Sequence, residues 1–141
     1  PTGPVYQAGT LSGNPPATAA GLATLKTIEA DSEFYAKLES TSAQLARGAR
    51  AACEKAGVPA TLNRVGSMMT LFFTEADKVV DYDSAMTCNT ERYGRFFQGC
   101  LRAGVYLPPS QFEAAFVSAA HTGSDIEAAL QAKETALAGL A

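Results

Sequence analysis

Apolar residues recur at helical spacing in four stretches of the chain, each with recognisable start or stop signals. The first stretch follows Asn14, which suits an N-cap, and begins with Pro15, which is tolerated at the first helical position. The second begins near Asp31 or Ser32, and Gly57 suits the left-handed position after its end. We therefore predict two consecutive helices in the N-terminal part of the chain.

The other two helical patterns lie in the second half. One is capped by Asn89 or Thr90 and ends at Gly104, and its apolar residues follow the spacing i, i+3, i+4, i+7, i+8. The last is capped by Thr122 or Ser124. Its apolar stripe consists of Ile126, Leu130, Leu137 and Leu140.

Three other apolar segments lack this spacing and predict strands. Residues 60–74 form an almost continuous apolar run, typical of a strand covered on both faces, with Gly66 as a bulge or bend. Residues 105–107 and 116–120 predict two short strands, because prolines and polar residues interrupt the chain between them. Residues 75–89 are polar and without period, so we predict a loop there.

The predicted order of elements is helix, helix, strand, loop, helix, strand, strand, helix, without internal repeats. This order is typical of an α+β layer, a short antiparallel or mixed sheet with helices on one side. The opening stretch and the first helix, which is rich in small alanines, indicate a part that belongs to a neighbouring body.

Composition agrees with a folded protein. The chain has 141 residues, 47% of them hydrophobic and 18% charged, which excludes general disorder. The net charge of −3 and the scattered basic residues predict no nucleic-acid partner. No apolar run reaches the roughly 18–20 residues of a membrane span, and the first residues do not resemble a signal peptide, so we expect no membrane association.

The cysteines and the histidine do not predict a metal site. Cys53, Cys88 and Cys100 are an odd set without CxxC spacing, so we interpret them as free thiols, with the first and the last packed on helices. His121 is the single histidine, and we expect it to hydrogen-bond to backbone at a strand end. Met68 and Met69 are expected to fill the core.

Nucleophilic catalysis finds no support in the sequence. There is no GxSxG motif and no cysteine in a recognisable catalytic context. No lysine has the pattern of a desolvated imine-forming residue. The lysines are Lys26, Lys37, Lys55, Lys78 and Lys133, of which Lys78 falls in the polar loop and the others on predicted helices.

Residues 8–15, with the sequence AGTLSGNP, have the composition of a phosphate-binding loop. Two glycines allow close approach of the backbone, two hydroxyls can donate hydrogen bonds, and a helix N-terminus follows. The spacing fits neither the Walker loop nor the dinucleotide fingerprint. From the residues alone, a turn with an N-cap is favoured over an anion site.

A second candidate is the loop of residues 107–113. Its prolines stiffen a segment that carries Ser110, Gln111 and Glu113 between two predicted strands. Functional groups are often presented on such loops, although a single glutamate in a loop is more commonly solvated.

Longer segments resemble a known family. Residues 5–15 (VYQAGTLSGNP), 19–25 (AAGLATL), 63–74 (NRVGSMMTLFFT), 104–122 (GVYLPPSQFEAAFVSAAHT) and 125–130 (DIEAAL) are similar to glutamate-1-semialdehyde 2,1-aminomutases, which are class III pyridoxal-phosphate aminotransferases. The resemblance covers essentially the whole chain in order. The combination of YQAGTLSGNP with SQFEAxFxSxAHT is highly specific within that class.

The resemblance implies the C-terminal third of a homodimeric enzyme with the aspartate-aminotransferase fold. Residues 1–30 would then end the large domain with a cofactor-phosphate loop and the connecting helix, and residues 31–141 would form the small C-terminal domain. The implied cofactor is pyridoxal 5′-phosphate. The implied reaction converts a small-molecule substrate, glutamate-1-semialdehyde, into 5-aminolevulinate for tetrapyrrole synthesis, in bacterial cytoplasm or in a plastid stroma.

The resemblance also implies site residues. Gly9 and Thr10 match residues that bind the cofactor phosphate of the neighbouring subunit, so the site would be shared across the dimer. Tyr6 matches a tyrosine at that shared site. Glu113 matches a glutamate that points at the substrate. The implied Schiff-base lysine lies upstream of residue 1, so we expect this chain to be inactive by itself.

Some residues depart from the family pattern, and alternatives stay open. Pro16 and Thr18 replace the usual Leu and Met, Pro108 replaces an Ala, and Ala115 replaces a Gly near Glu113. One alternative is another class III aminotransferase with a separate amino acceptor. The other is a small domain that serves as an assembly module without catalysis.

Overall fold

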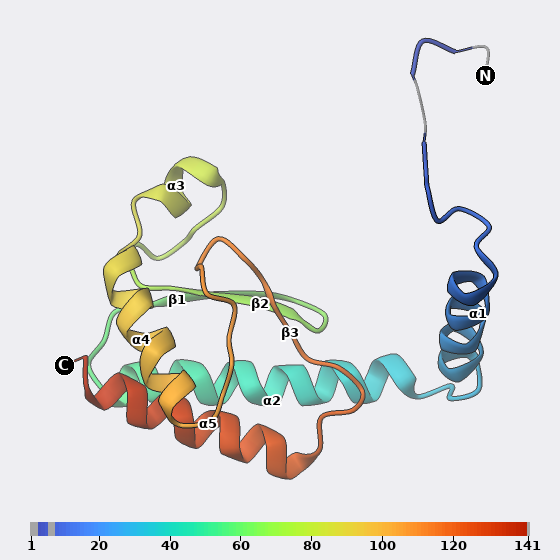
Figure 1. The fold of residues 1–141 in the computed structure, drawn as a ribbon. Helices are drawn as coiled ribbons and strands as arrows, with labels where there is room; N and C mark the ends of the chain where they lie inside the picture. Colours follow the sequence, from blue (N-terminus) through green and yellow to red (C-terminus); the bar gives the residue numbers. More distant parts are fainter. Residues whose placement is uncertain (1–2, 6–7, 141) are drawn as a thin grey trace. The chain divides into compact units, whose positions relative to one another are not determined.

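The computed structural model describes residues 3–5 and 8–140, which divide into two units (Figure 1). The first unit extends to Phe34, and the second runs from Tyr35 to the end of the chain.

The first unit contains one helix, α1 (Pro15–Glu29), preceded by two turns within its described residues. Asn14 is the N-cap, and its Oδ1 accepts a hydrogen bond from the Ala17 amide at 3.2 Å. Prolines occupy the first two helical positions, where no amide donor is needed. The predicted helix start is therefore confirmed, since its chemistry is local. No residue of α1 is buried.

The second unit is an α+β layer with a three-stranded antiparallel sheet in the order β1-β2-β3. This confirms the predicted fold class. The elements are α2 (Phe34–Lys55), β1 (Thr61–Val65), β2 (Met68–Phe72), α3 (Tyr82–Met86), α4 (Thr90–Arg102), β3 (Ala115–Phe116) and α5 (Gly123–Ala138). The caps of α4 and α5 are Asn89 and Thr122, both among the predicted alternatives.

The prediction of one long strand over residues 60–74 is wrong, because the segment is a hairpin. Gly66 and Ser67 form the turn between β1 and β2, and Gly66 has the positive φ of 56° that such turns require. The hairpin has buried side chains on both faces, which accounts for its many apolar residues. Leu62 and Met69 pack with α2, whereas Phe72 packs on the opposite side with a cluster that includes Val79.

Three further details differ from the prediction. The polar segment 75–89 contains α3, whose first turn is closed by a capping box between Asp81 and Ser84. Residues 105–107 form no strand: Val105 and Leu107 pack against the core, and the segment pairs with none of the strands of the sheet. The predicted strand 116–120 is reduced to β3, because the chain turns away after Val117, whose amide still donates to Ser67 O at 2.9 Å.

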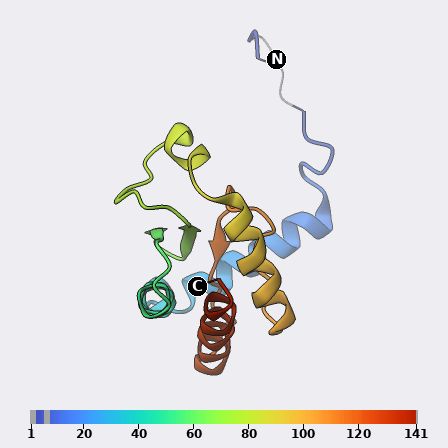
Figure 2. The ribbon, with the colours of Figure 1, turned by 90° about the vertical axis from the view of Figure 1, so that its left-hand side faces the viewer.

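The core lies between α2, α4, α5 and the sheet, and it is built around aromatic side chains. Phe73 and Phe96 meet edge to face with ring centroids 5.3 Å apart. Helices α4 and α5 lie side by side (Figure 2). Gly99 makes this close approach possible, since a Cβ there would lie 2.7 Å from the Cβ of Ala136. Small residues thus set the distance between the two helices.

The smaller predictions have mixed outcomes. Cys53, Cys88 and Cys100 are buried free thiols, as expected. Met69 is buried in the core, but Met68 is 41% exposed, so only one of the two methionines fills it. Within residues 3–5 and 8–140, no cluster of His, Cys, Asp or Glu could hold a metal ion. Nor is any helix of that part long and apolar enough to cross a bilayer.

Candidate functional site

The first candidate site is the turn before α1. The Ser12 amide donates to Gly9 O at 3.1 Å, and the Asn14 amide donates to Leu11 O at 3.0 Å. A Cβ on Gly9 would collide with the Ser12 hydroxyl, so a larger residue at position 9 would require the Ser12 side chain to move. Gly9 and Thr10 are both exposed. The turn therefore presents backbone and a hydroxyl next to a helix N-terminus, a combination suited to a phosphate group.

The second candidate is Glu113, which the structure places at the end of a tight loop. Its amide donates to Ser110 O at 3.2 Å, and its carbonyl accepts a hydrogen bond from the Thr70 hydroxyl of β2 at 3.4 Å. These contacts fix the backbone on both sides of the side chain. Glu113 is thus held by the sheet and by its own loop, whereas its carboxylate forms no ion pair within the described residues.

A core tyrosine holds the same loop, and one residue of the loop is itself buried. The Tyr93 phenol donates to Pro108 O at 2.7 Å. Burial raises the pKa of Tyr93 to about 12, so the phenol stays protonated as a donor near neutral pH. Gln111 is only 1% exposed, and neither end of its amide has a hydrogen-bond partner within the described residues. Sequence reasoning placed Gln111 on a loop and missed its burial.

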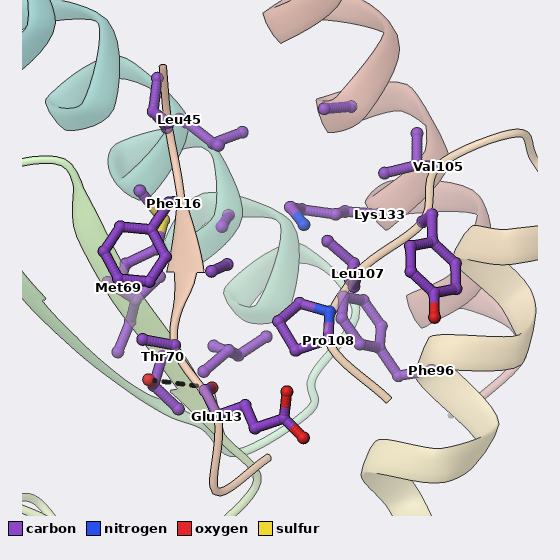
Figure 3. A pocket seen from close by; sticks show the side chains of 18 of the residues that line it. Leu45, Met69, Thr70, Phe96, Val105, Leu107, Pro108, Glu113, Phe116 and Lys133 are labelled. Carbon is purple, nitrogen blue, oxygen red and sulfur yellow. Dashed lines mark hydrogen bonds between the residues drawn. The ribbon is translucent and has the colours of Figure 1, made fainter. Parts of the chain in front are cut away.

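Glu113 lies at a cavity of about 220 Å³ between the sheet, α2, α4 and α5 (Figure 3). The wall is mainly apolar and includes Leu62, Met69, Phe96, Val105, Leu107 and Ile126. Two charged side chains, Glu113 and Lys133, also line it. The cavity therefore combines an apolar interior with few polar groups, as small-molecule sites do.

The prediction that no lysine is a desolvated residue is wrong for Lys133. It is 7% exposed, and its Nζ lies over the ring of Phe96, 5.6 Å from the centroid. Burial lowers the pKa of this amine below its usual value. One sequence signal could have found it, because Lys133 occupies the apolar stripe of α5 between Ile126 and Leu137.

The predicted site residues lie in different units of the chain. Gly9 and Thr10 lie together on the turn of the first unit, and Glu113 lies in the second unit. Tyr6 lies outside the described residues. His121 makes the backbone hydrogen bond that was expected: its Nδ1 accepts from the Ser118 amide at 3.0 Å.

Comparison with known proteins then decides the family. No family model matches the chain. Glutamate-1-semialdehyde 2,1-aminomutase of Desulfatibacillum aliphaticivorans is 57% identical over 137 residues, which are 97% of this chain and 32% of that protein. The enzyme of the same name from Thermus thermophilus is 53% identical over the same shares. The chain belongs with the C-terminal part of the glutamate-1-semialdehyde 2,1-aminomutases.

Solved structures agree with this aminomutase assignment at the level of fold. A β-phenylalanine aminotransferase from Variovorax paradoxus matches with a TM-score of 0.74 at 26% identity, over 98% of this chain and 31% of that one. A Sphingopyxis FumI protein, solved in its PLP internal aldimine form, matches with a TM-score of 0.73 at 25% identity, over 96% of this chain and 30% of that one. The chain thus spans about a third of the length of its aminomutase and aminotransferase relatives.

Proposed function

We propose that this chain is part of a pyridoxal-phosphate-dependent aminomutase that converts glutamate-1-semialdehyde into 5-aminolevulinate, a precursor of tetrapyrroles. The observation that carries the proposal is the 57% identity to an aminomutase over 97% of the chain. Pyridoxal phosphate is inferred as the cofactor from the aminomutase relatives and from proteins of the same fold, one of which was solved in its PLP internal aldimine form. When bound, it supplies the electron sink for the transfer of the amino group.

Gly9 and Thr10 are proposed to hold the cofactor phosphate. The exposed turn, in which Gly9 carries no side chain, lets an anion approach the backbone. The N-terminus of α1 adds the positive end of a helix dipole. The resemblance assigns this phosphate to the neighbouring subunit of a homodimer, with Tyr6 beside it, and that arrangement is part of the proposal.

Glu113 is proposed to orient the amino groups of the substrate through its carboxylate. Its backbone is fixed by Thr70 and Ser110, so the side chain starts from a defined position at the cavity. An ionised carboxylate is an acceptor that suits an ammonium donor.

The proposed lysine that carries the cofactor is outside this chain, and we propose that the chain has no activity by itself.

The reaction is tested with the intact protein by measuring 5-aminolevulinate formed from glutamate-1-semialdehyde without any added amino acceptor. An aminomutase needs none. Activity that appears only when a separate amino acceptor is added would instead identify an ordinary class III aminotransferase, and no activity in either case would favour an assembly module.

The cofactor site is tested with Thr10→Ala in the intact protein. We expect about tenfold weaker retention of pyridoxal phosphate, the effect of losing about 1.4 kcal/mol of hydrogen bonding. Thr18→Ala is the matched control, because Thr18 is an exposed threonine of the same unit, within α1. Equal cofactor affinity in the two variants would contradict the phosphate assignment.

A further inference from the structure

The amine of Lys133 has no counter-ion in the part of the chain that the structure describes. Ion pairs there join Lys55 to Glu134 and Arg64 to Glu39, and neither involves Lys133. Its nearest charge-stabilising contact is the face of Phe96. Burying an ammonium without a carboxylate is costly, so such groups are retained rarely without a chemical use.

The Lys133 side chain reaches from α5 into the apolar cavity (Figure 3). Cys53 of α2 and Cys100 of α4 lie near the amine. Burial raises the pKa of both thiols, to about 11 for Cys53, so they remain neutral near pH 7 and give the amine no anionic partner. Because Lys133 lines the cavity, a ligand that enters the cavity meets this amine directly, and the unprotonated fraction of the amine, which burial increases, is nucleophilic.

The lining of the cavity defines the class of ligand. About 220 Å³ of space between side chains such as Phe96, Leu107 and Ile126 accommodates a short aliphatic chain. Glu113 is an anion at the same cavity, so it disfavours ligands that carry a carboxylate. A neutral, mostly apolar small molecule fits best.

We propose that this cavity binds a small neutral aliphatic aldehyde, which Lys133 captures as an imine. The lone pair of Nζ attacks the carbonyl carbon, and the carbonyl π electrons move to oxygen, giving a carbinolamine. That intermediate loses water as the C=N double bond forms, and both amine hydrogens leave with the oxygen. No oxidant or reductant is needed, and the step is independent of the role proposed for Glu113 in the aminomutase reaction.

The test uses the intact protein, butanal as the aldehyde and sodium cyanoborohydride to trap the imine near neutral pH. Modified lysines of residues 1–141 are then located by mass spectrometry after digestion. We expect Lys133 to react about tenfold faster than Lys26 and Lys78, both exposed on the surface. Modification of those two lysines at the same rate, or before Lys133, would overturn the proposal.

Two comparisons establish that the cavity is responsible. Ala129→Leu fills the cavity from α5 without altering Lys133, and we expect it to abolish the preferential labelling. Circular dichroism checks that this variant is folded. Succinic semialdehyde, which carries a carboxylate, is expected to label Lys133 more slowly than butanal. Unchanged labelling in Ala129→Leu, or faster labelling by succinic semialdehyde, would contradict the proposed site.

Discussion

The phenol of Tyr93, in the first turn of α4, donates a 2.7 Å hydrogen bond to the carbonyl oxygen of Pro108. This bond joins a core helix to the loop that presents Glu113. Tyr93 also packs against Phe73 and Phe96, so its ring is fixed independently of the hydroxyl. A rigid aromatic cluster therefore determines where the loop begins.

Tyr93→Phe should lower the free energy of unfolding by about 1 kcal/mol, because the partly buried carbonyl of Pro108 loses its donor while the ring remains. The loop should also become more mobile, which hydrogen exchange of residues 107–113 would detect. Tyr106→Phe is the matched control, because Tyr106 is an exposed tyrosine whose ring packs on Phe97. Equal effects of the two substitutions would show that the Pro108 bond does not hold the loop.

Gly99→Ala should destabilise the second unit by about 1–3 kcal/mol. The added methyl group would lie 2.7 Å from the Cβ of Ala136 and 3.0 Å from its Cα, so α4 and α5 must separate. Gly94→Ala on the same helix has nothing within 4 Å and should be neutral or stabilising by up to about 1 kcal/mol. Urea denaturation compares the two variants. Similar losses in both would contradict a close contact between the helices.

Lys133→Met should raise the free energy of unfolding by about 1 kcal/mol near neutral pH, because it replaces a buried amine with a side chain of similar shape. The gain should shrink as the pH rises. The folded-state pKa of Lys133 lies below its ordinary value of 10.5, so the unfolded chain binds more protons between those two values. In that interval the wild-type protein gains stability with pH, and the methionine variant does not.

Urea denaturation at about pH 7 and about pH 9.5 measures this difference. Cys53 and Cys100, which lie near the amine on α2 and α4, and Glu113, which lines the same cavity, are present in both proteins, so the comparison removes most of their contribution. A difference that stays constant or grows with pH would show that Lys133 is not desolvated in the folded state.

Thr122→Ala should cost about 1 kcal/mol through loss of the N-cap of α5. The hydrogen bonds from Thr122 hold the pKa of Asp125 below its ordinary value of 3.8. A carboxyl with a lowered folded-state pKa stabilises the protein above its unfolded-state pKa and loses that effect as the pH falls through the folded-state value. The cost of Thr122→Ala should therefore decrease below about pH 4.

Thr135→Ala is the control for the capping prediction. Its hydroxyl donates to Gln131 O within the same helix, away from the cap. Acid titration of the unfolding free energy should show no comparable pH dependence for this variant. A cost of Thr122→Ala that is the same at pH 3 and pH 7 would mean that the Asp125 bond does not contribute.

The sequence determined the N-termini of α1, α4 and α5, because capping depends on neighbouring residues. Asn14, Asn89 and Thr122 each accept a hydrogen bond from an amide three residues later, and each begins a helix where the pattern predicts one. The family motifs could also be read directly. Their residues alone were enough to indicate the aminomutase relatives.

The division of residues 60–74 and the environment of Lys133 depended on tertiary structure. The apolar run fits one strand or two, and pairing of β1 with β2 across Gly66 selects the hairpin. The sequence places Lys133 on the apolar stripe of α5, but it does not show what covers that stripe. Lys133 becomes buried because Phe96 of α4 and the other side chains that line the cavity pack over its face of α5. Contacts between residues so distant along the chain form only in the folded protein.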